Sequence, residues 1–203
     1  MMKKTEKRTM MFDVRADPKS ESNVIIGTPI VFESKTDLGY FYEKIDRKAL
    51  DNADLSDVRF LVNHDMDSIP LARYCAGSAE NTMQLRIEPD GLKISVELDT
   101  ENNSEAKSLY SAVRRGDITG MSFAFNIDGE RWDDLDTDKP TRTLTSISRV
   151  FEVSAVTFPA YQSTDIKARN AADLENAKET LRQVRSKNDV ELAKLKAKYL
   201  YEI

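Results

Sequence analysis

The chain has 203 residues, of which 40% are hydrophobic and 32% charged, and its formal net charge at pH 7 is −5. This length suits one sizeable domain with an appendage, and the net negative charge argues against a nucleic-acid binder. The single cysteine, Cys75, excludes an internal disulfide and a cysteine-based zinc cluster. No apolar run is long enough to cross a membrane, so we expect a cytosolic protein without a membrane partner.

Residues 1–10 are basic and no apolar segment follows them, which predicts a disordered N-terminal tail. A β-rich run over residues 24–32 contains Gly27 and Pro29 and predicts a bent or edge strand. Residues 58–63 again predict a strand. Residues 83–87 and 92–98 alternate apolar and polar side chains around a Pro-Asp-Gly turn, which predicts a β-hairpin.

Residues 101–104 offer N-cap side chains, apolar residues follow at helical spacing, and Gly116 ends this pattern, so we expect a helix there. A short strand is predicted over residues 120–125, an exposed acidic loop over 128–141, and a further strand over 142–158. Many short strands at close spacing favour a closed barrel or a sandwich.

Residues 170–203 contain neither glycine nor proline, and apolar residues recur at helical spacing, which predicts an amphipathic helix. One interpretation is that this helix packs on its own domain. The other is that it forms a tether or coiled coil with a partner, in which Asn188 is a polar residue that sets the register.

Three residues are candidates for chemistry. Ser122 lies on the short strand, where it either packs or acts as a nucleophile held on a rigid element. His64, the only histidine, ends the 58–63 strand, and any histidine-dependent chemistry must use it. Glu152 lies within an apolar strand, where an unpaired carboxylate is costly, so it either faces solvent or has a specific partner.

Together these residues suggest that Ser122 Oγ attacks a peptide carbonyl, His64 takes and returns the proton, and Glu152 orients the imidazole. Cys75 is the rival nucleophile. A metal site made of His64, Asp65 and Asp67 is not favoured, because the three are closely spaced and no second histidine or cysteine pair completes the set.

Three segments in order resemble the head-maturation (prohead) proteases of tailed phages: Asn63-His64-Asp65, residues 114–125 and residues 152–161. The resemblance covers roughly residues 10–168. It implies the fold of the related herpesvirus assemblin proteases, an α+β protein with a mainly antiparallel β-barrel core, surrounding helices and here a C-terminal helix. It divides the chain into the tail (1–10), a protease domain (11–168) and a C-terminal helical segment (169–203).

The resemblance implies a serine endopeptidase that acts inside the immature capsid, in the host cytoplasm, and needs no metal or cofactor. Its substrates would be the scaffold or the scaffolding region of the major capsid protein, and the enzyme itself; self-association stays open. By position, His64 would be the base and Ser122 the nucleophile. Glu152 would stand where assemblins have a second histidine, and backbone N–H groups near residues 160–161 would bind the oxyanion.

Three alternatives stay open from the sequence. The chain could be a catalytically inactive capsid-assembly or scaffold protein on the same fold. It could be a peptidase that depends on Cys75 and His64. It could also be a structural β-domain whose function lies in a coiled-coil contact of its C-terminal segment.

Overall fold

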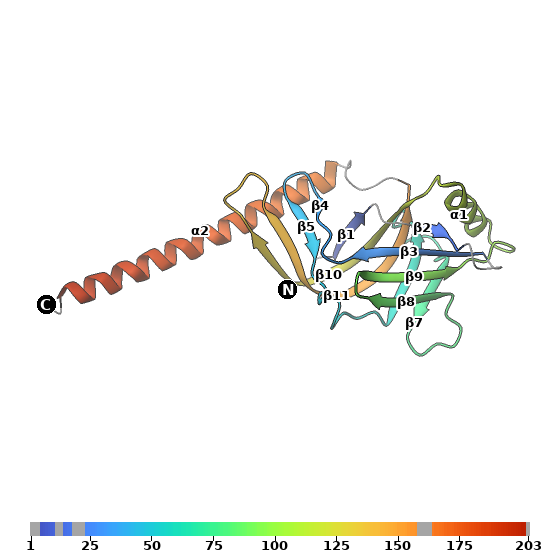
Figure 1. Ribbon diagram of the computed structural model, residues 1–203, viewed down its shortest axis with the longest axis horizontal. Coiled ribbons are helices and arrows are strands. Elements are labelled where there is room, and N and C mark those ends of the chain that lie inside the picture. The colour runs from blue at the N-terminus through green and yellow to red at the C-terminus, as the bar shows by residue number, and fades with distance from the viewer. Residues whose placement is uncertain (1–4, 11–13, 18–22, 158–163, 202–203) are drawn as a thin grey trace.

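The computed structural model describes residues 5–10, 14–17, 23–157 and 164–201. Two helices and a set of mostly antiparallel strands make up this part of the chain (Figure 1). The strands are β1 (Thr5–Met10), β2 (Val14–Ala16), β3 (Val24–Val31), β4 (Thr36–Asp37), β5 (Tyr42–Ile45), β6 (Asp57–Val62), β7 (Ala72–Cys75), β8 (Met83–Glu88), β9 (Gly91–Glu97), β10 (Gly120–Asp133) and β11 (Thr141–Val156); the helices are α1 (Ser104–Arg115) and α2 (Thr164–Tyr201).

The strands form two sheets. The larger has the order β1-β10-β11-β5-β4, with β6 also paired to β11 and β7 paired to β6, and the smaller has the order β2-β3-β9-β8. Most pairs are antiparallel, but β11 runs parallel to β5 near its start and parallel to β6 near its end. The predicted α+β class is therefore confirmed. In the described residues both sheets are open, and their closure into a barrel stays a prediction.

Local signals placed the β8–β9 hairpin and α1 correctly. The turn of the hairpin lies between Glu88 and Gly91, which are paired across the two strands. Helix α1 begins after Asn103, whose side-chain oxygen accepts hydrogen bonds from the second and third N–H groups of the helix. It ends at Gly116, which has a left-handed backbone with φ of 79°.

The predicted acidic loop over residues 128–141 is wrong in extent, because β10 continues to Asp133 and β11 begins at Thr141. Register shifts between residues 124 and 130 bend the long hairpin, as β-bulges do, without ending its pairing. Its far part is held by Trp132, whose ring meets that of Phe41 edge-on at 4.8 Å between centroids. A tertiary contact thus extends strands through a sequence that locally resembles a turn.

The predicted disordered tail is also wrong over Thr5–Met10, which forms β1 and pairs antiparallel with β10. Glu6 explains part of this outcome, because its carboxylate is buried and forms an ion pair with Arg142 at 3.2 Å. Arg142 also contacts Glu43 of β5, at 3.1 Å. Burial on its own lowers the pKa of Arg142, but the carboxylates of Glu43 and Glu6 outweigh it and raise this pKa.

The core lies between the two sheets and is closed at one end by α1. Its largest side chains include Phe60, Met83, Phe123 and Phe125, all fully buried. The rings of Phe123 and Phe125 stack with centroids 4.7 Å apart. Ser122 and Ala124, which alternate with them on β10, are also fully buried, so both faces of this part of β10 are covered.

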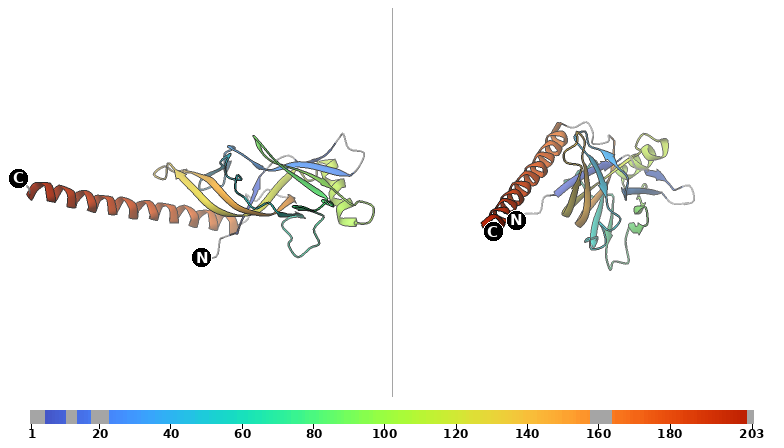
Figure 2. Two further views of the ribbon diagram at one scale, coloured as in Figure 1. Left: turned by 90° about the horizontal axis from the view of Figure 1, so that it is seen from below. Right: turned by 60° about the vertical axis from the view of Figure 1, so that its left-hand side comes forward.

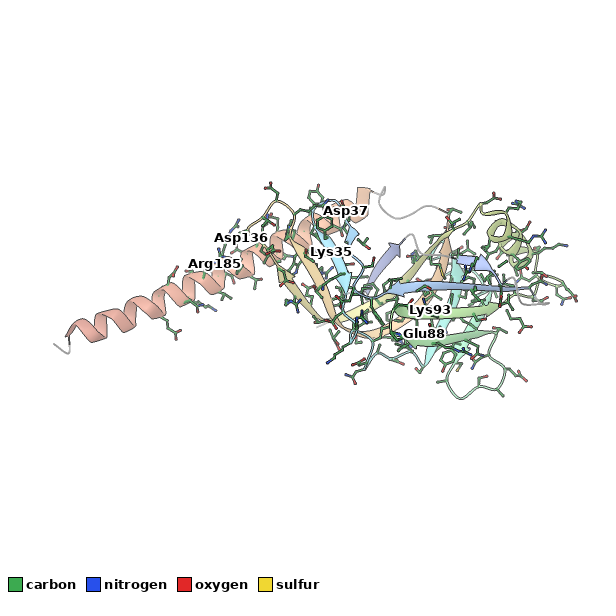
Figure 3. All side chains as sticks on the ribbon, viewed as in Figure 1. Lys35, Asp37, Glu88, Lys93, Asp136 and Arg185 are labelled. Carbon is green, nitrogen blue, oxygen red and sulfur yellow. The ribbon has the colours of Figure 1, made fainter. Side chains whose placement is uncertain are left out.

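In its described part, helix α2 lies along the body over residues 170–184, where Asn176, Thr180 and Val184 line a cavity together with Trp132 and Arg142. Leu174 is buried against Leu38 and Phe41, and the Asn170 side chain donates a hydrogen bond to the Leu38 carbonyl at 3.2 Å. The helix then extends away from the end opposite α1 (Figures 1 and 2). Val184 and Val190 are about half exposed, and Arg185 lies where the helix leaves the body (Figure 3). The predicted helix is confirmed, whereas its role stays a prediction.

In the described part of the chain, neither helix combines the length and apolar character needed to span a membrane.

Candidate active site

Strand register brings three polar side chains to one face of the larger sheet. Ser122 on β10 lies directly opposite Ser154 on β11, and Ala124 lies opposite Glu152. Residues directly opposite each other, and residues two apart on one strand, point to the same face. Ser122, Ser154 and Glu152 therefore share a face, and all three are buried.

His64 reaches this face from a tight turn that follows β6. Asn63 and His64 both have left-handed backbones, with φ of 53° and 60°, a conformation that asparagine tolerates better than most residues. The Asn63 N–H donates to the Ala155 carbonyl at 2.9 Å, and the Asn63 side-chain oxygen accepts from the Thr157 N–H at 3.0 Å. These bonds tie the turn to the end of β11 and direct the imidazole back over the sheet.

The three residues predicted from the sequence lie in one chain of contacts. Ser122 Oγ is 2.5 Å from His64 Nε2, and His64 Nδ1 is 2.5 Å from Glu152 Oε1. Both separations are within hydrogen-bonding distance. Ser122 is 0% exposed and Glu152 1%, while the His64 side chain is 13% exposed. The imidazole is thus the part of this group nearest to solvent.

A fourth residue of the site, Ser154, was missed by sequence reasoning. Its hydroxyl donates to Glu152 Oε2 at 2.5 Å and accepts from the backbone N–H of His64 at 3.2 Å. The available signal was its position two residues after Glu152, which places it on the same face of a strand. Its contact with His64 depends on the tertiary fold, since 90 residues separate the two in sequence.

The structure does not bring Cys75 to His64. Cys75 on β7 pairs with Asp57 at the start of β6, whereas His64 follows the end of that strand. The six residues of β6 are separated by five steps of about 3.3 Å, which puts roughly 17 Å between the two ends of the strand. Cys75 is half-buried, and its N–H donates to the Asn81 side chain at 2.7 Å.

Asp65, the residue after His64, is engaged in its own turn. Its carboxylate accepts hydrogen bonds from the Ser68 hydroxyl at 2.5 Å and the Asp67 N–H at 3.1 Å. The bond from the Ser68 hydroxyl, and to a smaller extent the bond from the Asp67 N–H, holds the pKa of Asp65 below its usual value. Within the residues that the structure describes, no group of three or more histidine, cysteine, aspartate or glutamate side chains is arranged to hold a metal ion.

Two cavities flank the turn that carries His64. One, of about 510 Å³, lies between this turn and α1 and includes Asn63, Asp65 and Leu109 in its lining. The other, of about 470 Å³, has Met66, Phe151 and Glu152 among its lining residues. Space for a bound polypeptide segment is therefore present beside the turn that carries His64, although His64 and Ser122 themselves line neither cavity.

A hydroxyl in contact with an imidazole, whose other nitrogen meets a carboxylate, is the arrangement that activates serine for acyl transfer. The imidazole draws off the hydroxyl proton, and the carboxylate favours the charged imidazolium that results. The oxyanion donors expected near residues 160–161 lie outside the described residues.

Comparison with known proteins adds one finding. A family model described as caudovirus prohead serine protease matches residues 10–180. The matched range includes Ser122, His64, Glu152 and Ser154 and extends into α2. Searches of curated proteins and of solved structures give no match.

Proposed function

The chain belongs to the caudovirus prohead serine protease family, and we propose that it is an endopeptidase with Ser122 as nucleophile, His64 as general base and Glu152 as the third member of the triad. The observation that carries the proposal is the pair of 2.5 Å contacts that link Ser122 Oγ, the two imidazole nitrogens of His64 and Glu152 Oε1. Membership of the family makes the chain a serine peptidase of phage head maturation.

In the proposed mechanism, Ser122 Oγ adds to the carbonyl carbon of the scissile peptide while its proton passes to His64 Nε2. When the tetrahedral intermediate collapses, Nε2 gives that proton to the leaving amine, and an acyl ester on Ser122 remains. A water molecule, deprotonated by the same imidazole, then hydrolyses the ester. Glu152 holds the proton on Nδ1 throughout and stabilises the imidazolium by its charge.

Burial of the triad affects how a substrate enters. Because Ser122 is 0% exposed, a substrate carbonyl reaches Oγ only after a local displacement of neighbouring atoms. The two cavities beside the His64 turn offer space for the flanking residues of an extended peptide. A site that is covered until a substrate displaces its surroundings suits a protease that should act only at the high concentrations inside a closed shell.

The proposed substrates are the scaffold or the scaffolding region of the major capsid protein inside the prohead, and the enzyme itself. Capsid proteins are the substrates that the family implies. We further propose that the two sheets close into an assemblin-like barrel, because β3 contacts β10 and β7 contacts β8 where the sheets meet. The part of α2 from residue 186 onward is proposed as a tether to the scaffold, since it extends from the body (Figure 2).

The test is co-expression with the phage's own capsid protein, followed by intact-mass analysis, for wild type and Ser122→Ala. We expect wild type to trim the capsid protein or itself, and the folded variant to leave both at full length. Continued cutting by Ser122→Ala would point to Cys75 or a host protease, which a Cys75→Ala variant separates. No cutting by either protein would favour the non-enzymatic assembly protein.

A further inference from the structure

We propose that Ser154 is a positioning residue of the catalytic site: it holds the backbone of His64 directly and the ring of His64 through the Glu152 carboxylate. This inference rests on the proposed function, because its consequence is the alignment of the His64 imidazole for proton transfer. It adds a hydroxyl to the three side chains of the triad.

The hydrogen bonds form a closed ring that begins and ends at His64. The backbone N–H of His64 donates to Ser154 Oγ at 3.2 Å, and that hydroxyl donates to Glu152 Oε2 at 2.5 Å. The other carboxylate oxygen, Oε1, lies 2.5 Å from His64 Nδ1. The Ser154 hydroxyl therefore donates its single proton to the Glu152 carboxylate. Through a lone pair it also accepts from the backbone N–H of His64, whose ring that carboxylate orients.

Two features of the site require stabilisation by these hydrogen bonds. His64 holds a left-handed backbone with φ of 60°, which costs a non-glycine residue free energy unless its surroundings stabilise it. Glu152 has a flexible side chain, and without the Ser154 hydroxyl on Oε2 its carboxylate can rotate and move Oε1 out of line with Nδ1. In the described residues, the Glu152 carboxylate is contacted by His64 and Ser154. Arg59, which lines the 470 Å³ cavity together with Glu152, instead forms an ion pair with Asp57 at 3.2 Å.

Kinetics of purified enzyme with a cleavable capsid-derived peptide test the role. We expect Ser154→Ala to lower kcat about ten- to a hundredfold with little change in KM, which is the range for losing a hydrogen bond to a charged group. Ser154→Thr, which keeps the hydroxyl, should recover most of kcat. Ser148→Ala is the matched control, because Ser148 lies on the same strand and, among the residues that the structure describes, its hydroxyl donates to the Asn126 carbonyl at 3.4 Å rather than to a residue of the site.

The single histidine of the chain gives a readout that a purely structural role would not move. In protein labelled with ¹⁵N-histidine, all imidazole nitrogen signals belong to His64. We expect wild type and Ser154→Thr to show one tautomer with the proton on Nδ1, and Ser154→Ala to show a mixture of tautomers. The measurement needs no substrate, so it reports on Ser154 even if peptide cleavage by the chain is not observed.

The outcomes separate this inference from the proposed function. A folded Ser154→Ala with wild-type kcat and a single Nδ1–H tautomer overturns the positioning role and leaves Ser122 as nucleophile. A wild-type protein with the proton on Nε2 overturns it without any variant, which keeps the proposal testable if Ser154→Ala does not fold. If Ser122→Ala still cleaves while the tautomer shifts as expected, the proposed function fails and the ring of hydrogen bonds stands.

Discussion

Glu152 Oε1 lies 2.5 Å from His64 Nδ1, although 88 residues separate the two in sequence. The parallel pairing of β6 with β11 produces this contact, because it places the turn after β6 beside the part of β11 that carries Glu152. A buried carboxylate on an apolar strand thereby gains the specific partner that its position requires.

Replacing Glu152 by glutamine keeps the shape of the side chain but removes its charge and changes the hydrogen-bonding pattern. We expect Glu152→Gln to lower kcat by about a hundredfold to ten-thousandfold with KM nearly unchanged, because the imidazole loses both its favoured tautomer and the charge that stabilises the imidazolium. Steady-state kinetics on a capsid-derived peptide measure this. A variant with wild-type kcat would remove Glu152 from the mechanism.

Arg142 joins β11 to β1 and β5 through Glu6 and Glu43, and all three side chains are buried. We expect Arg142→Met to lower the free energy of unfolding by about 3–5 kcal/mol, because two buried carboxylates lose this guanidinium. The control is Arg131→Met, whose side chain is 56% exposed in its pair with Asp133; it should cost less than about 1 kcal/mol. Urea unfolding compares them, and equal losses would contradict a structural role of the buried cluster.

The pH dependence of this contribution follows from the direction of the shift. The nearby carboxylates of Glu43 and Glu6 raise the pKa of Arg142 above its ordinary value, so the stability that this residue provides is fully present below that ordinary pKa and is lost only at strongly alkaline pH. We therefore expect the difference in unfolding free energy between wild type and Arg142→Met to contain no contribution from titration of this guanidinium near neutral pH. Urea unfolding of wild type, Arg142→Met and Arg131→Met at several pH values measures how this difference in unfolding free energy depends on pH.

Helix α2 should divide into a packed and a free part. Leu174→Ala is expected to cost about 2–4 kcal/mol of unfolding free energy, because Leu174 is buried against Leu38 and Phe41. Removing residues 186–203 should change that free energy by less than about 1 kcal/mol, since residues 185–191 are exposed. A large loss on truncation would contradict this division. If the tether proposal holds, the truncated protein enters proheads less well while it still cleaves a peptide in solution.

The parts of the fold that the sequence predicted well are those with local signals. Asn103 and Gly116 mark the ends of α1, and the turn before Gly91 marks the β8–β9 hairpin. By contrast, β1 and the extended β10–β11 hairpin depend on partners that are distant in sequence. Glu6 meets Arg142 across 136 residues, and no local pattern within residues 5–10 indicates such a contact.

The candidate site shows the same division. His64, Ser122 and Glu152 were selected because each is a reactive side chain in or beside a β-type segment, and the structure brings the three together. Ser154 is not distinguished in the sequence from a serine that packs on a strand, since its distinguishing bond is to the backbone N–H of His64, which is distant in sequence. The left-handed turn at Asn63 and His64 was likewise not indicated by the sequence.

Covalent labelling of Ser122 tests the central claim most directly. The purified protein is incubated with a fluorophosphonate, which reacts with activated serine hydroxyls, and the adduct is mapped by peptide mass spectrometry. We expect the adduct on Ser122 in wild type and in Cys75→Ala, and none in His64→Ala, because the hydroxyl then lacks its base. An unmodified Ser122 in wild type, or equal labelling of Ser122 with and without His64, would contradict the account.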